Sequence, residues 1–156
     1  MEFTINRDIF LKSLSHAYGI IEKKTTLPIL SNILIEAKNS KIRITATDLD
    51  IIYSEEILLK ELKNEGSTTT SAGILYDILR KLEPNSKIKF SLQGTNKLNL
   101  ISGNSNFNLL CISPDNFPLL DEDIKQKTFE VLSQQVLKLL NKTKISISND
   151  ETRHYL

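Results

Sequence analysis

Cysteine and tryptophan are nearly missing from this chain of 156 residues, which has one cysteine, Cys111, and no tryptophan. A single thiol excludes a disulfide framework and leaves no second cysteine for a zinc site. Aromatic residues make up only 6% of the chain, which argues against a surface that stacks the bases of single-stranded nucleic acid. With 5 glycines and 4 prolines, the composition is that of a folded protein and not of a disordered one.

An excess of charge of one sign is also missing. Lysine and arginine number 20 against 19 aspartates and glutamates, so the net charge is +1, and any anion-binding surface must be a local patch. The N-terminus has no basic stretch followed by an apolar core, and no apolar run approaches the length of a membrane span. We therefore expect no membrane partner and a cytoplasmic location.

Hydrophobic periodicity predicts an α+β domain. Phe3 and Ile5 alternate in a first strand, and Asn6 or Asp8 can cap a helix that runs to about Ile21. Ser71 can cap a second helix, with Ile74, Leu75, Ile78, Leu79 and Leu82 facing inward. The remaining strands are expected at Ile29–Ala37, Lys41–Thr47, Ile51–Leu62 and from Gly66, followed by a three-stranded meander around Ile88–Leu92, Leu98–Leu100 and Phe107–Cys111.

A weak internal repeat indicates how the domains are organised. Phe129, Val131, Val136, Leu137, Lys138 and Leu140 repeat the spacing of Phe3, Ile5, Phe10, Leu11, Lys12 and Leu14 at a shift of 126 positions. We therefore expect one complete domain over residues 1–120, a linker over 121–127 rich in acidic residues, and the truncated start of a second copy over 128–156.

No catalytic motif is recognisable. The chain has no phosphate-binding glycine loop and no nucleophile elbow, and its two histidines, His16 and His154, lie far apart. Asp48 and Asp50 could act as an acid/base or metal pair, although a polar turn is the more ordinary explanation. Cys111 is expected to be a buried structural thiol. We expect no enzyme activity, no cofactor and no metal.

Basic residues lie on the predicted polar faces of the helices. Lys12 and Arg7 belong to the first helix, Arg80 to the second, and Lys138 and Lys142 to a third, near residues 133–143. Acidic residues gather elsewhere, at Glu55, Glu56, Glu61, Glu65 and Asp121–Asp123. Basic helix faces can contact phosphates without reading sequence, although solvated lysines are common on any helix.

Five segments, in this order and spacing, resemble the beta sliding clamps of bacterial DNA polymerase III. They are Met1-Glu2-Phe3-Thr4-Ile5, Thr26-Leu27-Pro28-Ile29-Leu30-Ser31-Asn32-Ile33-Leu34, Thr45-Ala46-Thr47-Asp48-Leu49-Asp50, Asn116-Phe117-Pro118 and Arg153-His154-Tyr155-Leu156. The resemblance implies the DNA-clamp fold, in which each domain packs two inner helices on antiparallel sheets. It also implies a processivity factor, active as a homodimeric ring that encircles duplex DNA and tethers the replicative polymerase.

The resemblance also assigns roles to residues. Lys12, Lys24 and Arg80 match DNA-contacting positions, to which we add Arg7, Lys138 and Lys142 from the helix faces. Phe107 and Leu109 match the edge strand at the dimer interface. Arg153, Tyr155 and Leu156 match one wall of the cleft that captures peptides of the polymerase, the clamp loader and repair proteins.

Two other interpretations stay open at this point. The chain could be a truncated, non-functional remnant or a small protein-interaction module that forms no ring. It could also be a small enzyme that uses Asp48 and Asp50, although no other feature of the sequence favours this.

Overall fold

The structure, a computed structural model, describes residues 1–21, 27–118 and 129–147. The chain divides into two compact units, Met1–Leu120 and Asp121–Leu156. Among the described residues, no helix is both long enough and apolar enough to cross a membrane.

The first unit is built from two α-helices and nine strands over its described residues. The helices are α1 (Arg7–Ile20) and α2 (Ala72–Lys81), and a short 3-10 helix spans Pro28–Ser31. The strands are β1 (Glu2–Asn6), β2 (Asn32–Lys38), β3 (Lys41–Thr47), β4 (Ile52–Leu58), β5 (Glu61–Asn64), β6 (Gly66–Ser71), β7 (Lys87–Gln93), β8 (Lys97–Ser102) and β9 (Ser105–Ile112). A second 3-10 helix follows at Pro114–Asn116.

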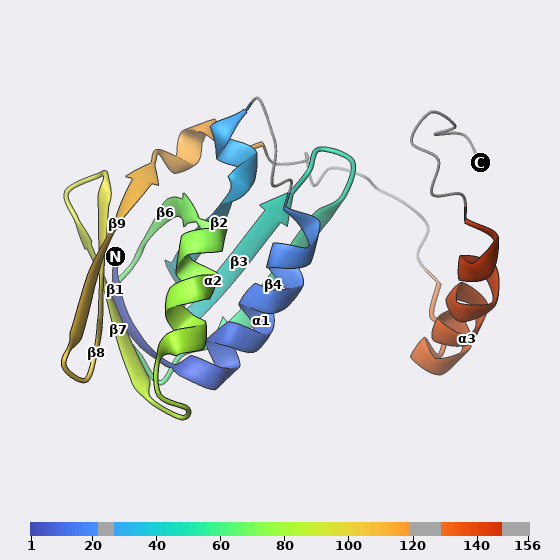
Figure 1. The fold of residues 1–156 in the computed structure, drawn as a ribbon, viewed down its shortest axis with the longest axis horizontal. Coiled ribbons are helices and arrows are strands. Elements are labelled where there is room, and N and C mark those ends of the chain that lie inside the picture. The colour runs from blue at the N-terminus through green and yellow to red at the C-terminus, as the bar shows by residue number, and fades with distance from the viewer. Residues whose placement is uncertain (22–26, 119–128, 148–156) are drawn as a thin grey trace. The chain divides into compact units, whose positions relative to one another are not determined.

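All nine strands form one antiparallel sheet in the order β4-β3-β2-β6-β9-β8-β7-β1-β5. Its two halves meet at a short ladder, where Thr69 pairs with Ile112 and Thr70 with Cys111. Helices α1 and α2 lie side by side over the sheet, with α1 against β3 and β4 and α2 against β2 and β6 (Figure 1). The architecture is thus the expected α+β arrangement of two helices on antiparallel strands.

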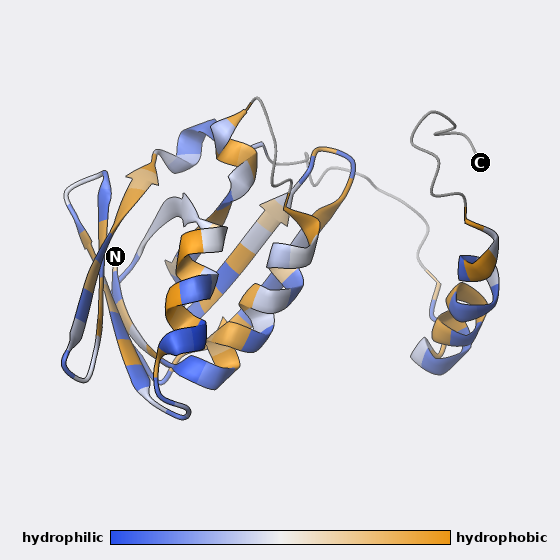
Figure 2. Cartoon of the chain, viewed as in Figure 1, coloured by the Kyte–Doolittle hydropathy of each residue, from blue (hydrophilic) through white to orange (hydrophobic). Residues whose placement is uncertain are grey.

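The core lies between the two helices and the sheet. Phe10, Leu14 and Ala17 of α1 and Leu75 and Leu79 of α2 are fully buried. The sheet contributes a second set of buried side chains, among them Phe3, Ile33, Ile35, Ile42, Ile44, Ile88, Phe90, Leu98 and Leu100. Each helix therefore has an apolar face covered by the sheet and a polar face left outside, and Figure 2 shows both classes of residue along each helix.

Three details differ from the sequence prediction. The stretch Ile51–Leu62 is not one strand, because β4 pairs with β3 whereas β5 pairs with β1 in the other half of the sheet. Strand β2 begins at Asn32, since Pro28 opens a 3-10 turn before it. Ile74 does not face inward: it is 56% exposed, one turn before the buried Leu79.

The second unit contains α3 (Ser133–Thr143) and a short 3-10 helix, Lys144–Ser146. The repeat shift of 126 positions carries the first residue of α1, Arg7, to Ser133, where α3 begins. Phe129 and Val131, the counterparts of two strand residues in β1, lie outside any strand. Every described residue of this unit is exposed, including Val136, Leu137 and Leu140 of the amphipathic helix.

Candidate nucleic-acid interface

Helix α1 presents Lys12 to solvent because its opposite side is fixed by a cap and by burial. The side chain of Asn6 accepts hydrogen bonds from the backbone N–H groups of Asp8 (2.9 Å) and Ile9 (3.3 Å), as the sequence predicts for an N-cap. Phe10 and Leu14 anchor the helix on the sheet. Lys12 is exposed on the other side, which is where a phosphate contact requires it.

Helix α2 presents Arg80 in a similar way. The hydroxyl of Ser71 accepts a hydrogen bond from the N–H of Ile74, and Leu75 and Leu79 are buried. The guanidinium carbon of Arg80 lies 5.6 Å from the centroid of the Tyr76 ring, a cation–π distance. This contact gives the exposed Arg80 a preferred position near the junction of the two helices.

Two tyrosines join the helices. The rings of Tyr18 on α1 and Tyr76 on α2 stack with centroids 4.8 Å apart, and the Tyr18 ring lies near Gly73. Beside the stack is a shallow depression of about 350 Å³, lined by Arg7, Asp8, Leu11, Lys12, Ser15 and Tyr76. Lys12 and Arg80 are thus brought to one surface, the α1–α2 surface, that the polar faces of both helices form.

Arg7 has a structural role that the sequence does not indicate. Its Nε donates a hydrogen bond to the carbonyl of Leu79 (2.7 Å), and one terminal nitrogen donates to that of Arg80 (3.1 Å). The other nitrogen pairs with the Asp8 carboxylate at 2.7 Å. Arg7 therefore satisfies the free carbonyls at the C-terminus of α2, and its guanidinium is already engaged. A role of Arg7 in DNA contact stays a prediction.

The carboxylate of Asp8 is tied into the same junction. Arg7 and, after it, the backbone N–H of Asn85 hold the pKa of Asp8 below its ordinary value. Asp8 therefore keeps its charge at neutral pH, and the pair joins the first turn of α1 to both the end of α2 and the turn that follows it.

Glu55, one of the acidic residues expected away from the basic helix faces, lies beside the α1–α2 surface. Glu55 on β4 accepts a hydrogen bond from the hydroxyl of Tyr53 and lies 3.9 Å from Nδ1 of His16. The Tyr53 hydroxyl is itself 3.3 Å from the same His16 nitrogen. The alternation of Tyr53, Glu55 and the buried Ile57 along one strand is the signal that could have placed Glu55 against α1.

The contact between Tyr53 and Glu55 shifts the pKa of both side chains. The Tyr53 hydroxyl is the main cause that holds the pKa of Glu55 below its ordinary value, with Ser13, His16 and Lys12 adding to it against the effect of burial. Burial, followed by the neighbouring Glu55, raises the pKa of Tyr53 to about 12. At neutral pH Glu55 is therefore an anion and Tyr53 a neutral donor.

The other predicted DNA-contacting residues belong to the second unit or lie outside the described residues. Lys138 and Lys142 are exposed on α3 of the second unit. Lys24 lies outside the described residues, as do Arg153, Tyr155 and Leu156 of the predicted peptide cleft. Their roles stay predictions.

Strand β9 carries the two predicted interface residues, Phe107 and Leu109. It pairs with β8 from Ser105 to Leu110, whereas β6 reaches it only at Cys111 and Ile112. Among the described residues, the rest of that edge has no paired strand. Leu109 is 5% exposed and belongs to the core, and Phe107 packs partly buried against it. At this edge, a second strand could pair with the free backbone N–H and C=O groups of β9 and contact the exposed part of the Phe107 side chain.

The residues considered for other chemistry have structural explanations. Asp48 accepts hydrogen bonds from the N–H groups of Asp50 (3.0 Å) and Ile51 (2.7 Å), which makes it a turn residue. Cys111 is partly buried, and burial raises its pKa. Within the described ranges, no group of three or more histidine, cysteine, aspartate or glutamate side chains could hold a metal ion.

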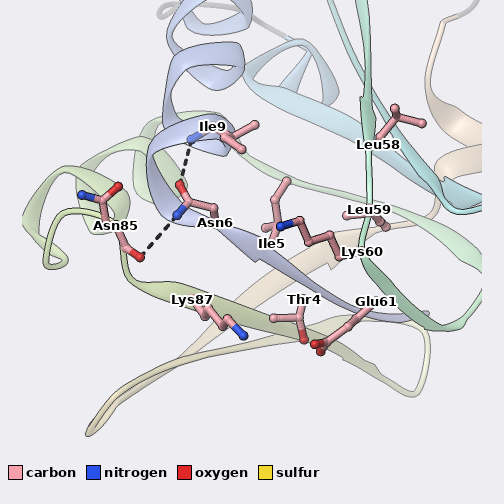
Figure 3. Close-up of a pocket in the computed structure, with 10 residues that line it drawn as sticks. All are labelled: Thr4, Ile5, Asn6, Ile9, Leu58, Leu59, Lys60, Glu61, Asn85 and Lys87. Carbon is pink, nitrogen blue, oxygen red and sulfur yellow. Dashed lines mark hydrogen bonds between the residues drawn. The ribbon is translucent and has the colours of Figure 1, made fainter.

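One cavity, of about 300 Å³, lies between the start of α1 and the β4–β5 connection. It is lined by Thr4, Ile5, Asn6, Ile9, Leu58, Leu59, Lys60, Glu61, Asn85 and Lys87 (Figure 3). The polar contacts drawn there are those of Asn6, which caps α1 and donates to the carbonyl of Asn85 at 3.3 Å. The lining contains neither histidine nor cysteine.

Comparison with known proteins identifies the family. Residues 1–121 match the family model of the DNA polymerase III beta subunit, N-terminal domain. The chain is 35% identical to the beta sliding clamp of Caulobacter vibrioides over its whole length, and 36% identical to that of Staphylococcus epidermidis. It covers 42% and 43% of those two proteins, so it spans about two-fifths of the length of these relatives.

A solved structure agrees with this match. The crystal structure of the C. crescentus beta sliding clamp superposes on 99% of this chain with a TM-score of 0.92 and 35% identity, and the match covers 41% of that protein. The sequence comparison and the structural comparison therefore give the same family. The chain belongs to the family of bacterial beta sliding clamps, the beta subunits of DNA polymerase III, and matches their N-terminal portion.

Proposed function

We propose that this chain forms the N-terminal part of a ring-shaped processivity factor that encircles duplex DNA and tethers the replicative polymerase. The observation that carries the proposal is the α1–α2 surface of a clamp-family domain, on which Lys12 and Arg80 are exposed while the opposite faces of both helices are buried. Lysine and arginine contact backbone phosphates of any sequence, which is what sliding requires.

The same proposal covers the other roles. The open edge of β9, with Phe107 and Leu109, pairs with another subunit in a homodimeric ring. Polymerase, clamp loader and repair proteins bind through a peptide cleft to which Arg153, Tyr155 and Leu156 contribute. The protein acts in the cytoplasm and catalyses no reaction, because its effect is to keep a partner on DNA. Residues 1–120 act as the first clamp domain, and the residues from 128 onward open the second.

A topological experiment tests this function. In a chimera, the chain replaces the matching 42% of the C. vibrioides clamp and is loaded onto nicked circular DNA by the clamp loader of that organism. We expect the chimera to stay on the circle at a salt concentration that removes simple binders, and to leave when the circle is cut. Equal retention on circular and linear DNA would instead favour an interaction module without ring formation.

Charge reversal in the same chimera tests the assigned surface. Lys12→Glu together with Arg80→Glu should reduce the amount of clamp loaded by about tenfold or more, since each reversed charge repels phosphate. Lys87→Glu with Lys97→Glu is the matched control, because these exposed lysines alternate with the buried Ile88 and Leu98 on β7 and β8. Equal effects of the two double variants would contradict the assignment of the α1–α2 surface to DNA.

A further inference from the structure

Tyr53, Glu55 and His16 form a polar cluster beside the α1–α2 surface. The strand β4 runs against α1, and Ile57 of this strand is buried beneath the helix. Two residues earlier on the same side, the Glu55 side chain is 37% exposed and reaches the rim of the helix. An anion has therefore been placed next to a surface whose proposed ligand is also an anion.

Contacts from two elements hold this anion in place. The Tyr53 hydroxyl donates to it from β4, and Nδ1 of His16 lies 3.9 Å from it on α1. The groups that face Glu55 with positive charge are Lys12 and, when protonated, His16, both on α1. Glu55 is therefore a fixed neighbour of the one lysine that α1 presents to solvent.

We propose that Glu55 restrains the contact between Lys12 and DNA, and so sets how firmly this part of the clamp holds the duplex; this inference rests on the proposed function. A fixed carboxylate attracts the Lys12 ammonium and repels an approaching phosphate. Its net result is to cancel about one cation of the surface, because it lies 3.9 Å from Nδ1 of His16, on the same face of α1 as Lys12 and one turn after it. A ring that must slide gains from a weak grip.

The next residue along β4 provides a matched control. Glu56 points to the other face of the sheet, where it pairs with Lys41 (2.9 Å) and Arg43 (2.8 Å). Glu55→Gln and Glu56→Gln thus change the net charge equally, one beside α1 and one away from it. The glutamine oxygen at position 55 can still accept the hydrogen bond of Tyr53, so the local structure is kept.

The experiment measures binding of a short fluorescent DNA duplex to the 156-residue chain by anisotropy, over a series of salt concentrations. Glu55→Gln should tighten binding by about 3- to 10-fold at low salt and steepen the slope of log K against log salt by roughly 0.9, the value for one added phosphate contact. Glu56→Gln should stay within about twofold of the unchanged chain. Equal effects of the two variants would overturn the proposal.

A third variant separates this inference from the proposed function. If Lys12→Gln weakens binding several-fold while Glu55→Gln changes nothing, the restraint is wrong and the DNA-binding surface stands. If neither variant changes binding, or if no form of the chain binds at low salt, the assignment of α1 to DNA fails and the restraint fails with it. Thermal unfolding of each variant verifies that the fold is intact.

Discussion

Helices α1 and α3 begin at corresponding positions of the internal repeat, yet their apolar faces have different surroundings. Phe10 and Leu14 of α1 are fully buried against the sheet, whereas their counterparts Val136 and Leu140 on α3 are 37% and 60% exposed. The sequence periodicity of the two helices is similar. What differs is the presence of strands, since β3 and β4 cover α1 and none of the described residues of the second unit forms a strand.

This difference shows that an amphipathic pattern specifies a face and not the partner that covers it. Packing against a sheet supplies most of the stability of a short helix, because the intrinsic helical propensity of 11 or 14 residues is marginal in water. The first unit therefore contains its own core, and the apolar side of α3 is available to other residues.

The largest expected effect comes from the aromatic centre of the first unit. Phe90 is fully buried, stacks on Phe3 at 4.9 Å and meets Phe10 edge-on at 5.2 Å. Phe90→Ala should lower the free energy of unfolding by about 3–5 kcal/mol, through lost transfer energy and the cavity left behind. Urea unfolding followed by circular dichroism measures this. Leu137→Ala on α3 is the control, and a loss above about 0.5 kcal/mol there would break the comparison.

The next largest effect concerns the contact that joins the two helices of the first unit. Arg7 is 13% exposed and binds two carbonyls at the end of α2. Arg7→Ala should cost about 1–3 kcal/mol of unfolding free energy, because those carbonyls and Asp8 lose their partner. Arg80, an exposed arginine in the last turn of α2, serves as the control. If Arg80→Ala is equally destabilising in the same urea experiment, the capping role of Arg7 is wrong.

A smaller effect is expected from helix capping, which is present at both helices of the first unit and absent at α3. Asn6 caps α1 and Ser71 caps α2, whereas Leu132 precedes α3 and offers no side-chain acceptor. Leu132→Asn should stabilise α3 by about 1 kcal/mol and slow its amide hydrogen exchange by roughly fivefold. Leu132→Ala removes the same leucine without adding an acceptor. Exchange slowed equally by both variants would show that capping is not the cause.

The smallest effect is a titration confined to the first unit. The pKa of Tyr53 is raised to about 12, first by burial and then by Glu55. Because the folded value lies above the ordinary value of 10, the stability it contributes is complete below pH 10 and disappears as the pH rises from 10 to 12. Ultraviolet absorbance should show a late tyrosine ionisation that Tyr53→Phe removes. Glu55→Gln should move it to lower pH, and an unmoved titration would exclude the hydrogen bond as a cause.

Local signals in the sequence predicted most of the elements. Asn6 and Ser71 were identifiable as caps because a cap bonds to residues two or three positions away. Strand β3 has the predicted bounds of Lys41–Thr47, since turns flank it on both sides. The single predicted strand Ile51–Leu62 failed, because alternation continues through the point where the chain leaves β3 and joins β1.

The candidate site was less predictable, because its contacts join residues that lie far apart in the sequence. Lys12 and Arg80 could be placed on polar helix faces from periodicity alone. The engagement of Arg7 depends on where the end of α2 lies, which is 72 residues away along the chain. Likewise Glu55 counts as one more acidic residue until β4 is known to run beside α1. Whether a charged side chain is already paired depends on its neighbours in the folded structure, and a single sequence does not show which residues those neighbours are.

The short ladder between β6 and β9 has a mechanical consequence. The two halves of the sheet are connected there through two residue pairs, reinforced by hydroxyl hydrogen bonds from Thr69 to the carbonyl of Ile112 (2.9 Å) and from Thr70 to that of Leu110 (3.1 Å). Under tension across the sheet, this joint carries the load through far fewer bonds than the ladders on either side of it. The two halves of the sheet would therefore separate first at this ladder, and the hydroxyl hydrogen bonds of Thr69 and Thr70 oppose that separation.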